Sequence, residues 1–366
     1  MNPLKITLIT LSVLAGMMVS LAHGLAAMSD DSMSEITGQS LFSASYIAPG
    51  GSNPNVGVGF YRVGVEANIA INANINKLRL GCDGPGGTGA CDISIDRLRL
   101  TGFASTAVNS NEGPLTDFLI NQPFFEFAIK NPDNPATRQV VGIRFGALEA
   151  LGRLSIGENP DTTTLADDTG LNTLSGDLNL NIKNAKLTNV RIDFPLVSII
   201  PLNASIDESF SQQVIVKRAT QVDDLGPLTA IVEGVAGLGI PLLNALKLTN
   251  AHLLNTPLNS IHNIDVKDPS STAAAPVPTK DFSLSMQGQD INWQKVSAGN
   301  FSGVTAQQGW WISIPQVVFQ DLVVNDRIDV PLGDVLGGLF GTRVELAGVD
   351  LGMRPVDNCW GASTFC

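Results

Sequence analysis

The stretch YRVGVEANIAINANINKLRL, residues 61–80, is the part of the sequence that decides the fold class. From Tyr61 to Ile75, apolar side chains alternate almost strictly with polar or small ones. A period of two is that of a β-strand whose apolar face lies in a core and whose other face lies in water. At about 3.3 Å per residue, one such strand would run roughly 50 Å. Strands usually have about 3–10 residues, so the stretch predicts an elongated sheet.

After Ile75 the alternation changes phase, because two polar residues instead of one precede Leu78. The resulting pattern, apolar-x-apolar-x-x-apolar-x-apolar, recurs over 73–80, 93–100, 180–187, 312–319 and 344–351. A slip of one residue would turn every later side chain to the wrong face. A bulged or bent residue instead keeps the apolar set pointing inward. The repeat therefore predicts strands that kink at a fixed place, in a curved sheet or at the corners of a β-solenoid.

Shorter apolar runs predict further strands over 42–47, 124–129, 140–145, 189–194, 212–218, 282–286 and 310–314. Helical signal is confined to 227–248 and 330–340, where glycines interrupt apolar runs, so we expect one or two short helices. We predict a mainly β fold with an elongated, curved and largely antiparallel sheet, arranged as a sandwich or roll with kinked long strands. An irregular β-solenoid is the alternative.

The composition excludes several classes of protein. The 366 residues include 34 acidic and 22 basic side chains, for a formal charge of −12. Nucleic-acid binding requires a basic face, so no nucleic-acid partner is expected. The hydrophobic content of 44% is too high for a disordered chain.

The first 24 residues have the organisation of an export signal. Lys5 precedes an apolar run from Ile6 to about Ala22, and small residues follow up to Gly24. We predict a signal peptide over 1–24. An uncleaved membrane anchor is the alternative, although the apolar run is at the short end for spanning a bilayer. Both interpretations place the rest of the chain in the periplasm, in the outer membrane or at the cell surface.

The cysteines form two close pairs, Cys82 with Cys91 and Cys359 with Cys366. Short loops between paired cysteines are typical of disulfides in an oxidising compartment, and these two local pairings are the expected ones. A metal site is disfavoured, because neither pair has C-x-x-C spacing and no histidine is close to either. We predict neither a metal nor a cofactor.

One segment marks a candidate internal boundary. Residues 268–280, DPSSTAAAPVPTK, are rich in proline, alanine and serine and predict a linker or exposed loop. They separate a main β domain over 40–267 from a C-terminal β segment over 281–366. We expect that segment to end in its own disulfide and to pack on the main domain.

A search for chemistry finds no catalytic constellation. His252 and His262 have no further ligands at a metal-site spacing, and neither a nucleophile elbow nor a phosphate-binding loop is present. We predict that the protein is not an enzyme. The acidic loop over 157–170 lacks the spacing of an EF-hand, and whether it binds calcium is left open. Trp310 and Trp311 are adjacent on a predicted strand, so one of them is expected in the core.

The predicted mature N-terminus carries a short motif. Residues 25–39 read LAAMSDDSMSEITGQ, which favours a short helix or leader with an N-cap at Ser29 and a stop at Gly38. Its apolar edge, a candidate partner-docking surface, consists of Met28, Met33 and Ile36. The segment resembles the L-x-x-M-[SD]-D-x-x-[LM]-S-x-[IV]-T-G-Q motif of a family of exported gammaproteobacterial proteins, some encoded with Fil-type pilus or filament proteins. The resemblance implies a surface or appendage-associated protein and supplies no catalytic residues.

We therefore expect an exported, non-enzymatic protein of the envelope or surface, structural or adhesive, and associated with a pilus-like filament. Its expected partners are other envelope or filament proteins, or further copies of itself. A periplasmic lipid- or ligand-binding β module is the alternative, since curved sheets with an aliphatic face can hold acyl chains. An outer-membrane β-barrel is disfavoured, because 2 tyrosines provide little for aromatic girdles. Membrane contact is not predicted.

Overall fold

The computed structural model describes most of the chain after residue 40, namely 41–83, 89–103, 117–158, 168–194, 197–206, 210–232, 247–272, 274–301, 303–320, 322–324, 327–339 and 341–359. The chain divides into two units, Met1–Leu41 and Phe42–Cys366, and the second is described below. Several predicted features fall outside the described residues: the signal peptide over 1–24, the leader over 25–39, and the docking residues Met28, Met33 and Ile36.

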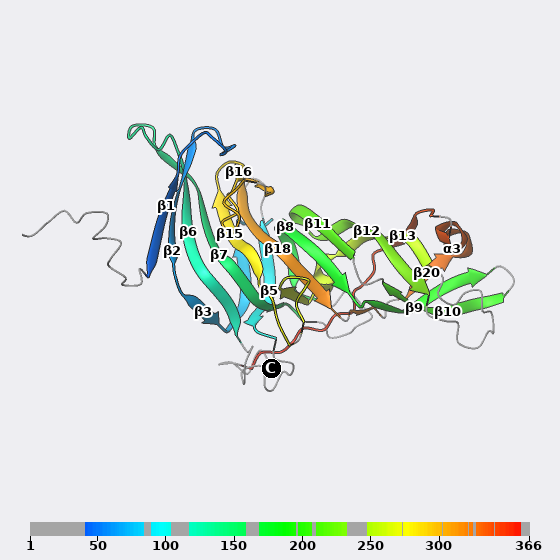
Figure 1. The fold of residues 1–366 in the computed structure, drawn as a ribbon. Coiled ribbons are helices and arrows are strands. Elements are labelled where there is room, and N and C mark those ends of the chain that lie inside the picture. Colours follow the sequence, from blue (N-terminus) through cyan, green and yellow to red (C-terminus); the bar gives the residue numbers. More distant parts are fainter. Residues whose placement is uncertain are drawn as a thin grey trace, which may run out of the picture. The chain divides into compact units, whose positions relative to one another are not determined.

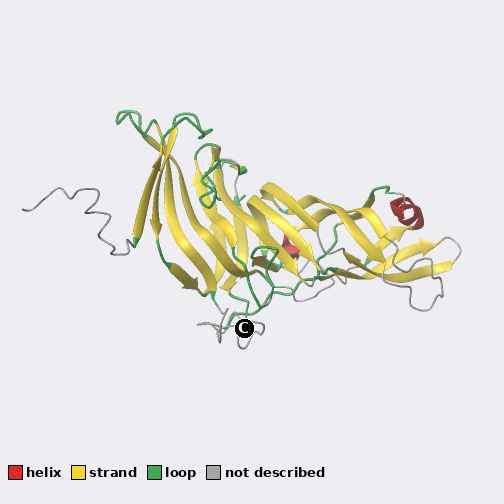
Figure 2. Cartoon of the chain, viewed as in Figure 1, coloured by secondary structure: helices red, strands yellow, loops and turns green. Residues whose placement is uncertain are grey.

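The described part of this unit is mainly β, as predicted (Figure 2). Its larger sheet has 12 strands: β1 Phe42–Ile47, β2 Val58–Val65, β3 Asn68–Ile71, β4 Ala73–Leu80, β5 Ile93–Thr101, β6 Phe118–Lys130, β7 Gln139–Ser155, β8 Leu171–Lys183, β11 Phe210–Ala219, β14 Asn263–Val266, β15 Thr279–Gln287 and β18 Gly309–Gln320. The main path through it is β1-β2-β6-β7-β14-β18-β8-β5-β4. Figure 1 shows β1, β2, β6 and β7 side by side at one end of this sheet. Strand β15 pairs with both β7 and β18.

The smaller sheet has 7 strands: β9 Lys186–Phe194, β10 Val197–Ile206, β12 Gln221–Val232, β13 Lys247–Pro257, β19 Val323–Val324, β20 Ile328–Pro331 and β21 Val344–Ala347. A two-stranded sheet consists of β16 Ile291–Asn292 and β17 Thr305–Ala306. The described helices are α3 Leu332–Leu339 and a 3-10 turn, η3 Leu258–Ser260. None of the helices in the described ranges has the length and apolarity needed to cross a membrane.

One buried apolar cluster contains side chains from both larger sheets, including Leu154 and Leu180 from the first and Leu225 and Leu253 from the second. A sandwich-like arrangement fits this shared core. Most strand pairs are antiparallel, and β7 pairs with β14 and β15, which lie far from it in the sequence. A solenoid would stack successive coils, so the β-solenoid alternative does not describe the fold.

All seven of the short runs predicted as strands lie inside strands β1, β6, β7, β9, β11, β15 and β18. Of the two predicted helical runs, 330–340 contains α3. The other run begins within β12, where Leu228 and Ala230 pair with β13 and are buried. Pairing with a neighbouring strand decides the structure there, and residues 233–246 lie outside the described part.

The stretch 61–80 does not form one long strand, which corrects the first prediction. It contributes to three strands, β2, β3 and β4. The break after β2 is a tight turn, in which the Ala67 amide donates to the Val65 carbonyl at 2.9 Å. In β2 the buried face is also the opposite of the one expected. Tyr61 and Val63, which were expected in the core, are exposed, whereas Phe60 is buried. The longest described strand is instead β7, with 17 residues.

The predicted kink is present where the first two copies of the repeated pattern meet. They lie opposite each other in β4 and β5, with Ile75 facing Leu98 and Leu78 facing Ile95. Between these pairs, Arg97 has a φ of 47°, in the left-handed region. A left-handed residue within a strand turns the apolar side chains that follow it back toward the core. Both apolar residues that flank this position in β5 are buried.

The other copies are only partly strand kinks. The copy over 312–319 lies in β18, whose register against β8 shifts between Ile314 and Val317, as a bulge requires. The copy over 180–187 spans the turn from β8 to β9, and the copy over 344–351 leaves β21 after Ala347. The pattern is therefore also compatible with a turn, because a left-handed residue can end a strand as well as bend it. Left-handed residues also bend β6, β11, β13 and β15, at Gln122, Arg218, Asn255 and Asp281.

The predicted linker over 268–280 leads from β14 into β15, which begins at Thr279, and residue 273 lies outside the described part. The loop is held by its own hydrogen bonds, including one from the Asp268 amide to the Val277 carbonyl at 2.9 Å. The strand that follows pairs with β7 from Thr279 to Gln287. Strands that come after the loop thus complete the sheet that begins before it.

Candidate functional site

The first predicted disulfide is present. Cys82 and Cys91 are bonded to each other. Next to them, Asp92 is buried, and its carboxylate accepts from the Trp310 amide at 2.9 Å and pairs with Arg218 at 2.7 Å. The end of the disulfide loop is therefore fastened to β18 and β11. Cys359 is also disulfide-bonded, whereas its predicted partner Cys366 lies outside the described residues.

The two histidines occupy structural positions. The His262 ring is fully buried, with Nδ1 2.8 Å from the Ile156 carbonyl and Nε2 3.4 Å from an Asp168 carboxylate oxygen. The His252 ring lies 2.7 Å from the Asp224 carboxylate. Burial alone would raise the pKa of Asp224, but hydrogen bonds from His252 and Arg343 hold it below its usual value.

Among the residues that the structure describes, no group of three or more metal-ligating side chains is present. Only the two ends of the acidic loop can be placed. Glu158 pairs with Arg97 at 2.7 Å, and Asp168 is buried beside His262. Residues 159–167 lie outside the described part, so calcium binding by this loop is left open.

The first candidate functional surface is the outer face of the strands β1, β2, β6, β7 and β15. Two rows of apolar side chains cross these strands, one formed by Ala44, Val63, Phe125, Phe145 and Leu284, the other by Tyr46, Tyr61, Phe127, Ile143 and Met286. Large side chains in both rows are exposed, including Phe125 at 49% and Tyr46 at 45%. Strands about 4.8 Å apart give this outer face an area of roughly 300–400 Å². The largest apolar patch on a typical monomer has about this size and often serves a function.

Strand β1 forms one edge of the larger sheet and borders the outer face. Its sequence FSASYI has no charge, and its residues from Phe42 to Tyr46 are exposed. The opposite edge strand, β4, carries Lys77 and Arg79, both exposed. Charged residues on an edge strand, especially lysine, block the addition of a further strand. Strand β4 is therefore protected against the addition of a further strand, whereas β1 is not.

The inner face of the same strands carries charges where a core is expected. Arg62, Glu126 and Arg144 lie side by side on β2, β6 and β7. The Glu126 side chain is 0% exposed, and its two oxygens pair with Arg62 at 2.7 Å and with Arg144. The Arg144 guanidinium lies between two rings, 5.2 Å from the centroid of Phe124 and 5.0 Å from that of Trp293. These contacts compensate the buried charges.

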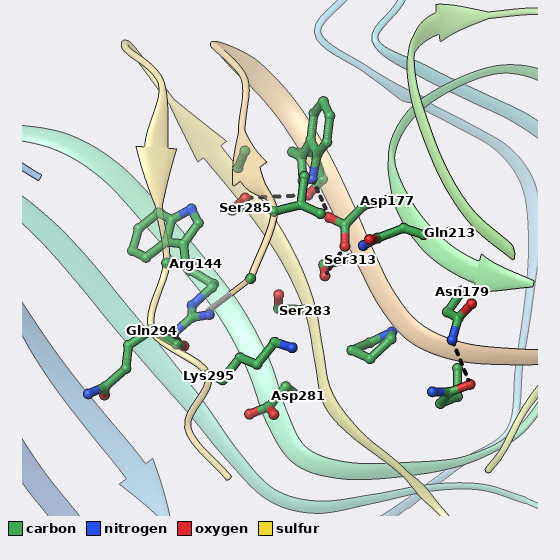
Figure 3. Close-up of a pocket in the computed structure, with 17 residues that line it drawn as sticks. Arg144, Asp177, Asn179, Gln213, Asp281, Ser283, Ser285, Gln294, Lys295 and Ser313 are labelled. Carbon is green, nitrogen blue, oxygen red and sulfur yellow. Dashed lines mark hydrogen bonds between the residues drawn. The ribbon is translucent and has the colours of Figure 1, made fainter. Parts of the chain in front are cut away.

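The second candidate site is a polar cleft beside this buried charge cluster, with a volume of about 430 Å³. The segment from β16 to β17 forms one wall, and side chains from β7, β8, β11, β15 and β18 form the rest (Figure 3). Seven of the lining side chains carry a neutral amide or hydroxyl group: Asn179, Gln213, Ser283, Ser285, Gln294, Ser313 and Gln316.

Four charged side chains also line the cleft: Arg144, Asp177, Asp281 and Lys295. The Asp177 carboxylate accepts from the Trp311 indole at 2.7 Å and from the Ser313 hydroxyl at 3.1 Å. Burial raises the pKa of Asp177, and the two hydrogen bonds counteract that rise. Trp311 is 1% exposed, so the prediction that one of the paired tryptophans lies in the core is confirmed.

Sequence patterns alone did not identify the buried charges of the inner face. A signal is nevertheless present, because Glu126 stands alone between phenylalanines in PFFEFAIK and Arg144 between apolar residues in GIRFG. Opposite charges at the same phase of apolar strands indicate an ion pair across a sheet. The polar cleft is assembled from five strands and one loop that are distant in sequence, so local spacing gave no sign of it.

Comparisons of the chain with protein-family models, with curated proteins and with solved structures find no match.

Proposed function

We propose that this protein is an exported structural component of the cell envelope or surface, associated with a pilus-like filament, and that two copies join through strand β1. The observation that carries the proposal is the unprotected outer edge of strand β1. It is an uncharged edge strand, and on its outer edge it pairs with no described strand. Such an edge is a template for a strand of another chain.

The sequence of β1 favours a second copy as the occupant. Around Ala44, the five residues Phe42-Ser-Ala-Ser-Tyr46 are symmetric in character. In an antiparallel pair centred on Ala44, each Phe42 faces the Tyr46 of the other copy and serine faces serine. Aromatic and hydroxyl pairs of this kind stabilise adjacent strands, and no like charges oppose each other. A two-fold axis uses the same strand twice, which is the commonest symmetry of soluble oligomers.

Pairing through β1 also enlarges the outer face. The two sheets become continuous, and the apolar rows that include Ala44 and Tyr46 continue from one copy into the other. The joined surface is roughly twice that of one copy, or about 600–800 Å². A stable interface buries about 800 Å² on each partner. The surface of the pair thus approaches the area that a filament partner requires, whereas that of the single chain is about half of it.

The compartment is supported by the disulfide. The Cys82–Cys91 bond is compatible with an oxidising, extracytoplasmic environment. The proposal assigns no catalytic reaction to the chain. A ligand-binding role is a second candidate function, and the polar cleft is the observation that favours it.

A charge-exchange experiment tests the pairing. In the proposed pair the two Ala44 residues lie directly opposite, so Ala44→Lys places two like charges about 5 Å apart. Exported Ala44→Lys protein and exported Ala44→Glu protein are each expected to be monomeric in native mass spectrometry. An equimolar mixture of the two is expected to form heterodimers, because the opposing charges then attract. Asn76→Lys on the protected edge strand β4 is the matched control and leaves the wild-type dimer unchanged.

Two results would overturn this proposal. One is a wild-type chain that stays monomeric at every concentration tested. The other is a dimer that persists in both single variants, because its interface then lies elsewhere on the molecule. Either result would be independent of the ligand site considered next, since no residue of β1 lines the cleft.

A further inference from the structure

The polar cleft holds hydrogen-bonding groups that the protein itself does not use. Within the described part of the chain, the side chains of Ser283, Gln213 and Lys295 have no hydrogen-bond partner, although all three line the cleft. Ser283 is only 4% exposed. A polar side chain buried to this extent is usually hydrogen-bonded. Its hydroxyl is therefore available to a molecule in the cleft.

The unused groups converge from separate elements. Ser283 lies on β15, Gln213 on β11 and Lys295 on the segment between β16 and β17. In Figure 3 the Ser283 side chain lies between Lys295 on one side and Asp177 with Ser313 on the other. Hydroxyl and amide groups both donate and accept, the lysine donates and the carboxylate accepts. The cleft thus presents donors and acceptors from several directions to one small molecule.

The charges of the cleft balance one another. Arg144 is paired with Glu126, and the Asp281 carboxylate accepts from the Ser297 amide at 2.8 Å. Lys295 acts electrostatically on Asp177 across the cleft. An anionic ligand would meet the two carboxylates, and a cationic one would meet the lysine and the arginine. Neither sign of charge is therefore favoured over the other.

The walls combine this polarity with apolar surface. Val304, Pro315, Trp293 and Trp311 all line the cleft, although the two tryptophans are only 7% and 1% exposed. Binding sites for small molecules commonly join apolar surface with a few placed polar groups, in volumes of about 300–1,000 Å³. A ligand with an apolar face and many hydroxyl groups matches both parts of this lining.

We infer that the cleft binds a neutral saccharide of one or two sugar units, with Ser283, Gln213 and Lys295 contacting its hydroxyl groups. The neutral charge balance excludes an anionic or cationic sugar as the preferred ligand. The inference does not depend on pairing through β1, so Ala44→Lys protein is expected to bind the same saccharide as the wild-type chain.

The test is a titration of the exported chain with a panel of glucose, galactose, mannose, N-acetylglucosamine, lactose and maltose. Tryptophan emission is the first readout, because Trp293 and Trp311 line the cleft. Saturation-transfer NMR is the second. At least one saccharide of the panel is expected to bind saturably. Ser283→Ala and Gln213→Ala are each expected to weaken its binding about tenfold, the effect of one lost hydrogen bond.

Neither variant is expected to disturb the fold, so weaker binding can be assigned to the lost contact. The Ser283 hydroxyl has no protein partner and Gln213 is exposed, so both chains are expected to keep the wild-type thermal transition. Ser45→Ala, on β1, is the matched control and is expected to bind like the wild type. The inference is overturned if no saccharide of the panel binds, if Ser283→Ala binds as tightly as the control, or if glycine or inorganic phosphate displaces the sugar at equal concentration.

Discussion

The strands β2, β6 and β7 have an outer and an inner face that reverse the usual relation between polarity and burial. On the outer face Tyr61, Phe125 and Phe145 are exposed, whereas on the inner face Glu126 and Arg144 are buried. Antiparallel sheets commonly place apolar side chains on the covered face and polar ones in water. Here the segment that follows β16 covers the charged face, with Trp293 packed on Phe60 at 5.4 Å between ring centroids.

The difference shows that burial in this sheet is determined by what covers each face. The inner face is covered by the chain itself, and its two guanidinium groups, from Arg62 and Arg144, share the carboxylate of Glu126. The outer face has exposed apolar side chains on β1, β2, β6 and β7, whereas on β15 its Leu284 packs against the buried core. Two such faces on the same strands are expected when the second face is completed by another molecule. The following predictions test the two faces separately.

The largest effect is expected on the inner face. Glu126→Gln removes the charge that compensates Arg62 and Arg144, and it leaves two buried guanidinium groups without a counter-charge. Breaking a buried ion pair on one side costs about 3–5 kcal/mol in the free energy of unfolding. Denaturant titration followed by circular dichroism measures this cost. Glu158→Gln, which breaks the exposed pair with Arg97, is the matched control and is expected to cost less than about 1 kcal/mol. Equal costs for the two variants would show that the inner charges are not buried in solution.

An intermediate effect distinguishes two neighbouring phenylalanines. Phe124→Ala empties an inner position where the ring contacts Arg62 and Arg144, and it is expected to cost about 3 kcal/mol. Phe125→Ala removes an exposed ring that packs edge-on against Phe145, and it is expected to cost less than about 1 kcal/mol in the monomer. Thermal unfolding of both variants on a monomeric Ala44→Lys background compares the two faces directly. If Phe125→Ala costs more than Phe124→Ala, the assignment of the faces is reversed.

The smallest effect concerns the pH dependence of stability. Burial raises the pKa of Asp177 above its unfolded value. Ionisation of this carboxyl therefore costs stability, and the cost grows as pH rises from the unfolded pKa through the folded one. Asp177→Asn removes this cost and retains an oxygen for the Trp311 indole. The variant is expected to gain stability relative to the wild type at neutral pH and to lose that gain at acid pH.

Asp224 provides the contrasting case. Its pKa is held below the usual value, so its contribution is present at neutral pH and is lost as pH falls through the folded pKa. Asp224→Asn is therefore expected to lose stability at neutral pH, with no loss at low pH. The free energy of unfolding of each variant, relative to the wild type, is measured against pH. If it changes with pH in the same direction for both variants, the opposite environments of the two carboxyl groups are contradicted.

Much of the fold could be predicted from local pattern. The alternation of apolar residues correctly indicated strands, and the two polar residues after Ile75 correctly indicated a kink, where Arg97 has a left-handed backbone. The pattern did not show which face of β2 would be covered, because that depends on a segment more than 200 residues later that includes Trp293. The cleft was missed for the same reason, since its residues meet only after strands distant in sequence have paired.

The most direct test of the account is a cross-link at the centre of the proposed strand pair. In a two-fold pair, the residues at position 44 have Cβ atoms about 4.5–5.5 Å apart, which suits a disulfide after a small adjustment. We predict that exported Ala44→Cys protein migrates as a dimer on a non-reducing gel and as a monomer after reduction, whereas Asn76→Cys stays monomeric. A monomeric Ala44→Cys chain, or equal cross-linking of both variants, would contradict the proposal that β1 is the edge through which two copies join.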